Sequence, residues 1–400
     1  MTTSFDIQPI GRFVGQSAAI KRPREIACFS YDDKHQFKLD DSSIRYYYPP
    51  TLGADLSKGF DTFEKMDDTA DDHLDSLLET IVAHEEKTGS RVEAEFVTWR
   101  GMMTKFMAAL FSDRDGFEMN ATLFQVGTHP HLRILCRLST TSLIHVAHFD
   151  SFIEENHGYK LQSQRRQSQQ VSQPGRPSQD MMSFWGYKFE TLCLLPAPWG
   201  ETSRSYIENR EEEIVNNYAQ YCSVVRTGIG NNVMILGGEV DAVWDCKPTG
   251  NGPINWVELK TSADIRGDRD MATFERKLMK FWIQSFLLGV PKIIVGFRTP
   301  DGFLKRIEEI ETATIPGTVK RQGRGTWDGN MCINFASALL EFLKATVTGD
   351  GVWRIRRKEH SSTIEVFKQE ETGHGDMLPD DFINWRIKLS MMEKEKSATA

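Results

Sequence analysis

The 400-residue chain has few cysteines and no long apolar run. Its six cysteines show no CxxC spacing, and no signal peptide precedes them, so free thiols in a reducing compartment are expected. No apolar run approaches the roughly 18 residues that a membrane span requires. We therefore expect a nuclear or cytosolic protein that does not cross a membrane.

The chain also lacks an excess of positive charge and several common catalytic motifs. Its formal net charge of −8 argues against broad, non-specific binding to nucleic acid. An RNA substrate would therefore require basic residues concentrated at one site, or a metal that screens the phosphates. The sequence contains no GxxxxGK[ST] loop, no GxSxG elbow and no Cys/His pair at catalytic spacing. These absences leave metal-dependent hydrolysis as the best-supported chemistry.

The most informative stretch is typical of two apolar strands joined by a loop rich in turn residues. The strands are predicted over Val233–Trp244 and Asn255–Lys260, and the loop over Lys247–Pro253. Gly237 and Gly238 stand directly before the first acidic residue of this stretch. Because glycine has no Cβ, they permit the close approach of a backbone or a ligand.

Each of these predicted strands carries a pair of charged residues on one face. Strand side chains alternate with period two, so Glu239 and Asp241 point the same way, as do Glu258 and Lys260. Acids inside apolar segments are costly to desolvate unless a cation compensates them. A strand with one wet face explains a single E-x-D pair. The second pair, E-x-K, favours a metal-nuclease site, in which a lysine orients or deprotonates the attacking water.

Three further polar residues stand in predominantly apolar segments. Arg100 either forms a structural ion pair or holds a phosphate through its planar guanidinium, and the sequence leaves both readings open. Glu190 lies in a helix predicted over Asp180–Leu194 and is a candidate to face inwards. Gln284 lies in a helix predicted over Met271–Leu288, where it is either a satisfied core amide or a ligand contact.

The ends of the chain and one internal stretch are polar. We expect a flexible N-terminus over residues 1–24, a single catalytic domain over 25–385 and a disordered tail over 386–400. The stretch from His157 to Asp180 is rich in Gln, Ser, Arg and Pro and predicts a mobile loop.

Five motifs in a fixed order resemble one known family. They are TWRG (Thr98–Gly101), WGYKFE (Trp185–Glu190), GGEVDAVWD (Gly237–Asp245), VELKTS (Val257–Ser262) and KFWIQSFLLG (Lys280–Gly289). The chain is similar in these segments to the decapping and exoribonuclease (DXO) family, and it resembles most the fungal nuclear decapping nucleases that act as partners of the nuclear 5′-3′ exoribonuclease. The likeness spans Glu25 to Phe342.

The resemblance implies a fold and an activity. The fold is a mixed α/β (α+β) architecture of two packed mixed β-sheets surrounded by helices, with a pocket related to the PD-(D/E)xK nucleases. The activity is the removal of incomplete caps, 5′-triphosphates and NAD caps from RNA 5′ ends in the nucleus. The implied cofactors are one or two Mg²⁺ or Mn²⁺ ions, which hard oxygen ligands suit. The implied partners are RNA 5′ ends and the nuclear 5′-3′ exoribonuclease.

The resemblance also implies roles for individual residues. The implied metal ligands are the side chains of Glu190, Glu239, Asp241 and Glu258 and the backbone carbonyl of Leu259. Of these, Glu239, Asp241 and Glu258 are the implied catalytic residues, together with Lys260. Lys260 and Gln284 would position the water or the scissile phosphate, with Glu190 also at the substrate. Arg100, flanked by Trp99 and Gly101, would hold a 5′ phosphate, and Cys222 would line the pocket.

One segment departs from the family pattern. A strand is expected to run straight from ATLFQ, which ends at Gln125, into FIEE, which starts at Phe152. Residues Val126–Ser151 intervene, with no period typical of a strand or a helix, so that 126–180 as a whole is an atypical insertion followed by the loop. One hypothesis is that 126–151 is a translated, unspliced intron, and the alternative is a genuine surface insertion. Sequencing the mature transcript decides between them.

Three functions remain open from the sequence. The first is a metal-dependent hydrolase of RNA 5′ ends, and the second is a DNA nuclease that uses the same metal chemistry. E-x-D with E-x-K alone permits either of these. The third is a protein that chiefly stabilises an exoribonuclease partner. Selectivity for RNA ends is expected to depend on the pocket around Arg100.

Overall fold

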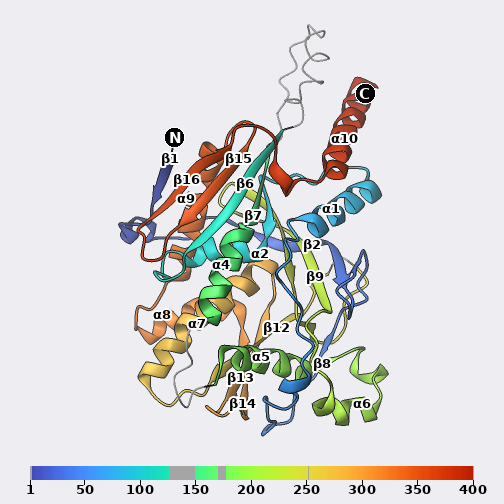
Figure 1. Ribbon diagram of the computed structural model, residues 1–400, viewed down its shortest axis with the longest axis vertical. Coiled ribbons are helices and arrows are strands. Elements are labelled where there is room, and N and C mark those ends of the chain that lie inside the picture. Colours follow the sequence, from blue (N-terminus) through green and yellow to red (C-terminus); the bar gives the residue numbers. More distant parts are fainter. Residues whose placement is uncertain (1, 126–148, 170–176, 251, 400) are drawn as a thin grey trace.

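The computed structural model describes residues 2–125, 149–169, 177–250 and 252–399. Its strands form two mixed sheets with helices around them (Figure 1). The larger sheet has ten strands, in the order β1-β16-β15-β6-β7-β5-β10-β9-β2-β3, and the smaller sheet has six, in the order β14-β13-β12-β11-β4-β8. The expected architecture of two mixed sheets surrounded by helices is confirmed.

The elements of the described residues have the following bounds. The larger sheet contains β1 (Thr2–Asp6), β2 (Ile20–Tyr31), β3 (Phe37–Lys38), β5 (Phe96–Trp99), β6 (Phe117–Gln125), β7 (Phe149–Glu155), β9 (Gln220–Ile229), β10 (Asn232–Glu239), β15 (Val352–Arg357) and β16 (Thr363–Glu370). The smaller sheet contains β4 (Tyr46–Tyr47), β8 (Leu194–Leu195), β11 (Ala242–Val243), β12 (Trp256–Ala263), β13 (Lys292–Arg298) and β14 (Leu304–Glu311). The α-helices are α1 (Asp75–Thr88), α2 (Arg100–Ala108), α4 (His157–Ser168), α5 (Gln179–Cys193), α6 (Arg204–Asn209), α7 (Asp268–Leu288), α8 (Ile315–Gln322), α9 (Gly329–Thr346) and α10 (Asp380–Thr399). Short 3₁₀ helices cover Ile10–Phe13, Phe60–Thr62, Trp199–Glu201, Arg210–Glu212, Thr312–Thr314 and Gly375–Met377.

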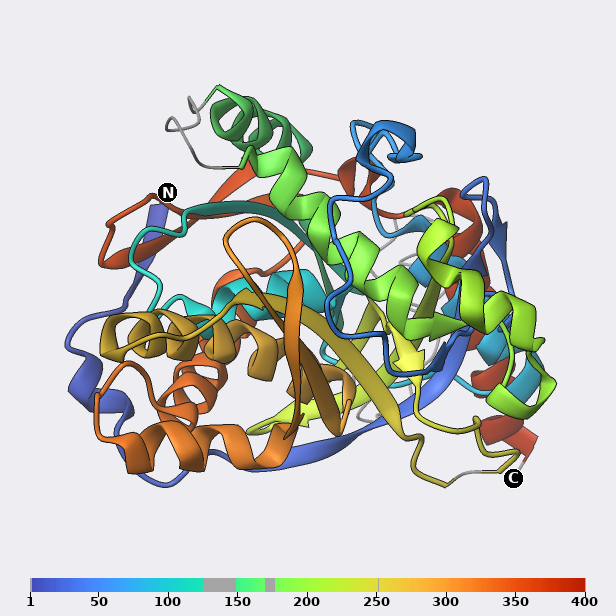
Figure 2. The same cartoon turned by 90° about the horizontal axis from the view of Figure 1, so that it is seen from below.

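The main core joins the two sheets through α2, α7 and α9. Its buried side chains include Met234 and Leu236 of β10, Phe106 of α2, Ile283 and Leu287 of α7, Leu339 of α9, and Ile293 and Val295 of β13. A second cluster packs α5 on the other face of the smaller sheet, with Phe189 and Leu192 against Val257, Leu259 and Ile294. Figure 2 shows α5 and α7 on different sides of β12 and β13. The alternation of side chains along β12 therefore sends Val257 and Leu259 towards α5 and leaves Glu258 on the opposite face.

The strand predicted over Val233–Trp244 is divided between the two sheets. β10 ends at Glu239 in the larger sheet, and β11 begins at Ala242 in the smaller one. Val240, which is buried in the main core, occupies the crossing. The prediction of one continuous strand is therefore wrong, and the two acids of the E-x-D pair lie where the chain passes from one sheet to the other.

The expectation of a flexible N-terminus over 1–24 is wrong for residues 2–24. β1 pairs antiparallel with β16, and Phe5 packs edge-on against Phe335 of α9. Phe13 is buried against the same Phe335 ring. The packing of these two aromatic rings holds the segment in place although many of its residues are polar. β1 is the edge strand of the larger sheet.

Two other stretches expected to be irregular are helical. α10 continues to Thr399, and buried Arg386 and Leu389 attach it to the rest of the protein, so the prediction of a disordered tail over 386–400 is wrong for 386–399. Residues 157–168 of the predicted loop form α4, because the Asn156 side chain accepts a hydrogen bond from the Tyr159 amide at 2.9 Å and caps the helix. The rest of that loop includes 170–176, which lie outside the described residues. None of the described helices combines the length and the apolar character that crossing a membrane requires.

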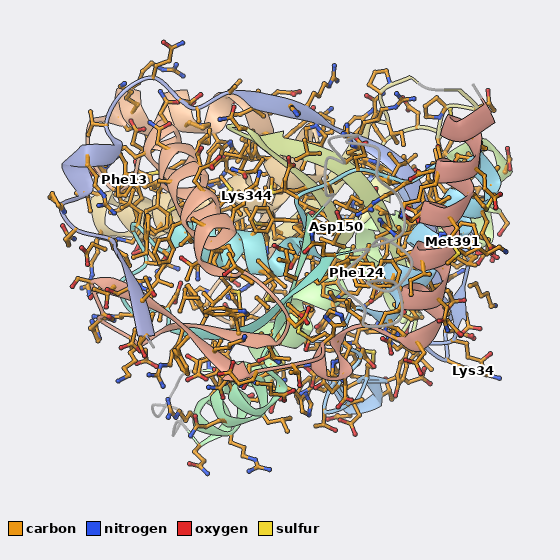
Figure 3. All side chains as sticks on the ribbon, turned by 90° about the horizontal axis from the view of Figure 1, so that it is seen from above. Phe13, Lys34, Phe124, Asp150, Lys344 and Met391 are labelled. Carbon is orange, nitrogen blue, oxygen red and sulfur yellow. The ribbon has the colours of Figure 1, made fainter. Side chains whose placement is uncertain are left out.

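The strands on either side of the proposed insertion are antiparallel neighbours. Gln125 of β6 faces Phe149 of β7, and Phe124 faces Asp150 (Figure 3). The expectation that one strand runs straight from Gln125 into Phe152 is therefore wrong, since the chain reverses direction between them. Residues 126–148, which carry most of the intron hypothesis, lie outside the described residues. Residues 149–151 belong to β7.

Candidate active site

The four acidic residues singled out in the sequence converge where the two sheets meet. Glu239 ends β10, Asp241 stands directly before β11, and Glu258 lies in β12. Glu190 comes from α5 and interacts electrostatically with all three. The Glu258 side chain is buried, whereas the other three acids are partly accessible to solvent. The structure therefore brings together carboxylates from three separate segments of the chain.

Arg100 reaches this cluster because β5 ends at Trp99 and α2 starts at Arg100, directly above two glycines. A Cβ on Gly238 would lie 2.9 Å from the Cβ of Arg100, and a Cβ on Gly237 would lie 2.7 Å from the Trp99 ring. With glycine at both positions, Arg100 Nη1 donates a hydrogen bond to the Glu239 carbonyl at 3.0 Å and lies 3.5 Å from Glu258 Oε2. The guanidinium is thus directed at the carboxylates.

Lys260 and the backbone of β12 bind two of the acids directly. Lys260 Nζ lies 2.6 Å from Glu258 Oε1 and forms an ion pair with it. The Leu259 amide donates to Asp241 Oδ2 at 2.6 Å. β12 therefore supplies an acid, a cation and a backbone donor from three successive residues, and these contacts fix how Asp241 and Glu258 lie relative to each other.

Burial and mutual repulsion set the protonation of the acids. Burial raises the pKa of Glu190 well above its ordinary value, and the Asp241 carboxylate raises it further. Burial also raises the pKa of Glu239, against the opposing effect of Arg100, and burial together with Glu258 raises the pKa of Asp241 to about 7. Glu258 differs from the other three. Although burial alone would raise its pKa, Lys260 and Arg100 lower it below the ordinary value.

The same contacts keep Lys260 charged. Burial favours the neutral amine, but the Glu258 and Asp241 carboxylates outweigh it and raise the pKa of Lys260 above its ordinary value. An ammonium donates hydrogen bonds and accepts none. The carboxylates around Lys260 therefore favour a role in orienting a substrate group over a role as a base.

The donor set fits a divalent cation. Four carboxylates face two cations, Lys260 and Arg100, so that two negative charges stay uncompensated when all four acids are ionised. Carboxylate oxygens are the hard ligands that Mg²⁺ and Mn²⁺ prefer. Within the described ranges, no three Asp, Glu, His or Cys side chains already enclose a position for an ion. Ligation would therefore require the carboxylates to turn towards the metal.

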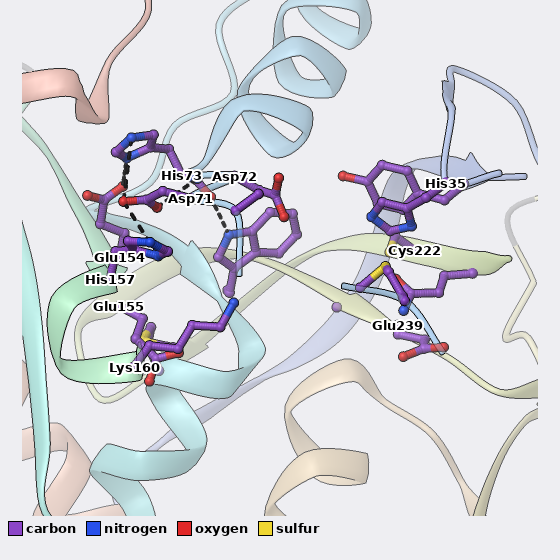
Figure 4. A pocket seen from close by; sticks show the side chains of 17 residues that line it. His35, Asp71, Asp72, His73, Glu154, Glu155, His157, Lys160, Cys222 and Glu239 are labelled. Carbon is purple, nitrogen blue, oxygen red and sulfur yellow. Dashed lines mark hydrogen bonds and ion pairs between the residues drawn. The ribbon is translucent and has the colours of Figure 1, made fainter. Parts of the chain in front are cut away.

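An open pocket of about 330 Å³ leads to this cluster. Cys222, Trp99 and Glu239 line it together with a second group of polar residues that had no motif in the sequence (Figure 4). In that group His73 Nδ1 lies 3.1 Å from Glu154 Oε2, and the Trp99 indole donates to the His73 carbonyl at 2.9 Å. His73 and Glu154 lie in segments whose sequences predict an ordinary helix start and a strand. The contact between them, which is not evident from the sequence, places them in the pocket.

The other residues that the resemblance implied, Cys222, Gly101 and Gln284, lie at different distances from the acidic cluster. Cys222 faces Glu239 across the β9–β10 pair and lines the pocket. Gly101 follows Arg100 in the first turn of α2. Gln284 lies one turn before Leu288, whose Cδ1 is 2.9 Å from where a Cβ of Gly238 would be, so α7 passes beside the site. Gln284 itself makes no hydrogen bond to the cluster among the described residues.

Comparison with known proteins identifies the family of this arrangement. The family described as RAI1 like PD-(D/E)XK nuclease matches residues 21–128 and 139–383. A protein of Gibberella zeae named decapping nuclease RAI1 is 60% identical over 398 residues, which cover 99% of this chain and 100% of that protein. The resemblance stated from the five motifs is confirmed.

Two solved structures resemble the whole fold. The crystal structure of Candida albicans Rai1 in complex with pU5 and Mn²⁺ superposes with a TM-score of 0.84 at 29% identity, covering 97% of this chain and 100% of that one. The crystal structure of Scheffersomyces stipitis Rai1 in complex with (3′-NADP)⁺ and a calcium ion gives a TM-score of 0.81 at 28% identity, covering 96% and 100%.

Proposed function

Because the chain belongs to the RAI1-like PD-(D/E)XK nuclease family, we propose that it is a divalent-metal-dependent hydrolase of RNA 5′ ends. Its substrates are incompletely capped, 5′-triphosphorylated and NAD-capped RNA. The observation that carries the proposal is the meeting of Glu190, Glu239, Asp241 and Glu258 around Lys260. The C. albicans complex with pU5 and Mn²⁺ supports an RNA substrate and a divalent ion, and the S. stipitis complex with (3′-NADP)⁺ supports NAD caps.

The four carboxylates would hold the ion, with the Leu259 carbonyl as a further ligand. When bound, one or two Mg²⁺ or Mn²⁺ ions supply charge that stabilises the attacking and leaving oxygens during in-line displacement at phosphorus. Lys260, held protonated by Glu258, donates a hydrogen bond that orients the attacking water or a phosphate oxygen. Gln284, on the helix that passes beside the site, assists this positioning.

Arg100 binds the 5′ phosphate. Among the described residues only its Nη1 is engaged, by the Glu239 carbonyl and Glu258, so its other guanidinium nitrogens are available to a substrate. The planar fork of an arginine matches a phosphate in two parallel hydrogen bonds. The ion pair of Arg100 with Glu258 supports the structural alternative, and the remaining guanidinium nitrogens leave room for the proposed phosphate contact. Trp99 and Cys222 line the pocket through which the RNA end enters.

The biological setting follows from the resemblance to the fungal nuclear members of the family. We place the protein in the nucleus, in quality control of RNA 5′ ends, as the partner that stabilises a 5′-3′ exoribonuclease. The hydrolytic and the partner-binding roles are separable. The double variant Glu239→Ala with Asp241→Ala should lose hydrolysis and keep the partner in a pull-down with the purified exoribonuclease.

The test is an assay of the wild-type protein with Mn²⁺ on differently ended RNAs of one sequence and on DNA. Expected products are GpppN from unmethylated caps, pyrophosphate from triphosphates and NAD from NAD caps, with DNA left intact. Cleavage of DNA at a comparable rate would favour the general DNA nuclease. If no substrate is hydrolysed while the exoribonuclease still binds, only the stabilising role remains.

A further inference from the structure

One long edge of the larger sheet has no strand beside it. β2 pairs with β9 along one side from Ile20 to Tyr31. On its other side, only Ser30 and Tyr31 pair with a strand, the two-residue β3. Among the described residues, no strand pairs with the outer side of Ile20–Phe29, although the Ile26 backbone is hydrogen-bonded to the His84 side chain. Such an edge exposes backbone N–H and C=O groups that another extended chain can pair with.

This edge forms one wall of a groove of about 700 Å³, called here the edge groove. Seven successive residues of β2, Arg22–Cys28, line it. Because strand side chains alternate between faces, a wall made of consecutive residues is the edge of the strand and not one of its faces. The opposite wall consists of residues from 247–250 and 252–256, which lie near β2 in Figure 2, and Leu288 and Pro291 also line the groove.

The rim of the edge groove is basic, although the chain as a whole carries a net charge of −8. Arg22 and Arg24 of the groove and the neighbouring Lys21 are exposed, and none forms an ion pair with an acid of the described residues. Arg226 stands opposite Arg24 in the β2–β9 register, and these four cations together line an adjacent hollow of about 480 Å³.

The acid that lies among these cations is already occupied. Glu25 Oε1 lies 2.9 Å from Lys247 Nζ, and Glu25 Oε2 accepts hydrogen bonds from Ser223 at 2.6 Å and from Tyr221 at 3.0 Å. Glu25 is therefore engaged with Lys247 and does not neutralise Lys21, Arg22 or Arg24. The basic rim keeps its positive potential for a ligand.

We propose that the edge groove binds an extended acidic peptide segment of a partner protein, which adds to the larger sheet beside β2. The backbone of the segment pairs with the free edge, its alternate apolar side chains enter the groove, and its acids face Arg22 and Arg24. Lysine and proline on an edge strand also hinder aggregation. However, protection against aggregation does not explain why this edge lies beside a groove with a second wall and apolar lining residues such as Leu288.

The occupant is a separate protein and not the chain itself. The segments outside the described residues, 126–148 and 170–176, contain no Asp or Glu. RNA phosphates would satisfy the basic rim but would leave the hydrogen-bonding edge of β2 unused. An acidic strand satisfies both, and the inference does not depend on the hydrolase proposed above.

Binding is tested with the full chain and a fluorescein-labelled peptide of alternating Glu and Val, followed by fluorescence anisotropy. The matched probes are a Lys/Val peptide and a 5′-hydroxyl oligouridylate. The acidic peptide should bind, and the double variant Arg22→Glu with Arg24→Glu should weaken it by about tenfold or more, because like charges then face each other. The control Arg114→Glu with Lys358→Glu makes the same charge change at exposed residues outside the groove and should leave the affinity unchanged.

Hydrogen exchange locates the peptide. Its binding should slow exchange of the amides of Arg22 and of residues 24–28, since Pro23 has no N–H. An unchanged midpoint of urea denaturation shows that the double variant is folded. Equal binding by both double variants, or protection of another strand, would overturn the proposal. If the oligouridylate binds and depends on Arg22 and Arg24 while the acidic peptide does not, the groove is an RNA site and the peptide proposal is wrong.

Discussion

The protein contains two clusters of buried charge that differ in balance. The first, called here the active-site cluster after the function proposed above, contains Glu190, Glu239, Asp241 and Glu258 with Lys260 and Arg100. The second, called here the α10 network, joins α10 to α1 and β7. In it, Arg386 lies 3.1 Å from Glu85 and 3.0 Å from Asp150, and Arg91 lies 2.7 Å from Asp150. The α10 network has two acids for two arginines, whereas the active-site cluster has four acids for two cations.

This difference separates a structural role from a chemical one. In the α10 network the Trp385 indole also donates to Glu85 at 2.9 Å, and Asp150 accepts from both Arg91 and Arg386. The charges of these two acids and two arginines balance without a ligand. The active-site cluster keeps an excess of negative charge that no described side chain compensates, and burial together with this excess raises the pKa values of three of its acids. A buried excess of one sign therefore marks the place where a cation is required.

The largest expected effect is on activity, from Glu258→Ala. This change removes the acid that holds Lys260 and Arg100, and we expect hydrolysis of every RNA substrate to fall by roughly 10³-fold or more. The free energy of unfolding should change little, because the loss of the ion pairs with Lys260 and Arg100 is offset by the loss of the repulsion between Glu258 and the other acids. Initial rates on capped, triphosphorylated and NAD-capped RNA, together with urea denaturation, check this. Unaltered activity on any one of these substrates means that the ligand assignment is wrong.

The opposite pattern is expected from Arg386→Met in the α10 network. Glu85 and Asp150 then lose a buried partner, which should lower the free energy of unfolding by about 3–5 kcal/mol. The rate constant of hydrolysis by the folded fraction should not change, since Arg386 lies outside the active site. Urea denaturation followed by tryptophan fluorescence measures the loss. Equal stability of the variant and the wild type would show that the network contributes little.

Metal ions should stabilise the protein through only one of the two clusters. At a Mn²⁺ concentration of 100 times its dissociation constant, the wild type should gain about 2.7 kcal/mol. EDTA should reverse this gain. The variant Asp241→Asn should lose most of it, whereas Arg386→Met should keep it in full. Thermal unfolding at several Mn²⁺ concentrations gives the result, and an identical gain in Asp241→Asn would place the ion elsewhere.

The smallest effect is expected from a single methyl group beside Arg100. In Gly238→Ala the new Cβ meets the Cβ of Arg100 and Leu288 Cδ1, each at 2.9 Å, so α2 or α7 must shift. We expect a loss of about 1–3 kcal/mol in the free energy of unfolding and a roughly tenfold loss in kcat/KM, because Arg100 is displaced from the carboxylates. Gly186→Ala in α5 is the control, since no atom lies within 4 Å of its added Cβ. Equal kinetics of the two variants would contradict the close packing.

The sequence predicts the active-site cluster better than the fold around it. Period-two alternation places Glu258 and Lys260 on one face, and both indeed meet in an ion pair. The same argument also predicted that Glu239 and Asp241 lie close together, which is correct. Its premise of one continuous strand is wrong, because that strand is divided between two sheets. Local pattern does not show where a chain leaves a sheet.

Contacts between distant segments were not predictable. β1 pairs with β16, so Thr2 faces Phe367, and Arg386 meets Glu85 and Asp150 from three separate elements. The local composition of 1–24 and 386–400 does not indicate these contacts. Polar residues at chain ends are ordinarily mobile, so disorder was expected at both ends. The two ends are ordered because single side chains, partly buried Phe5 and buried Arg386 among them, contact residues far away in sequence.

Asp150 lies within the proposed intron, residues 126–151, and forms ion pairs with Arg91 and Arg386. A transcript without the codons for 126–151 would encode a chain that lacks Asp150, in which Arg91 would lose its ion pair and Arg386 would keep only the one with Glu85 among the described residues. Both isoforms would carry the same nuclease residues. They would differ in how firmly the C-terminal helix is attached, so that limited proteolysis near residue 380 could distinguish the two gene products.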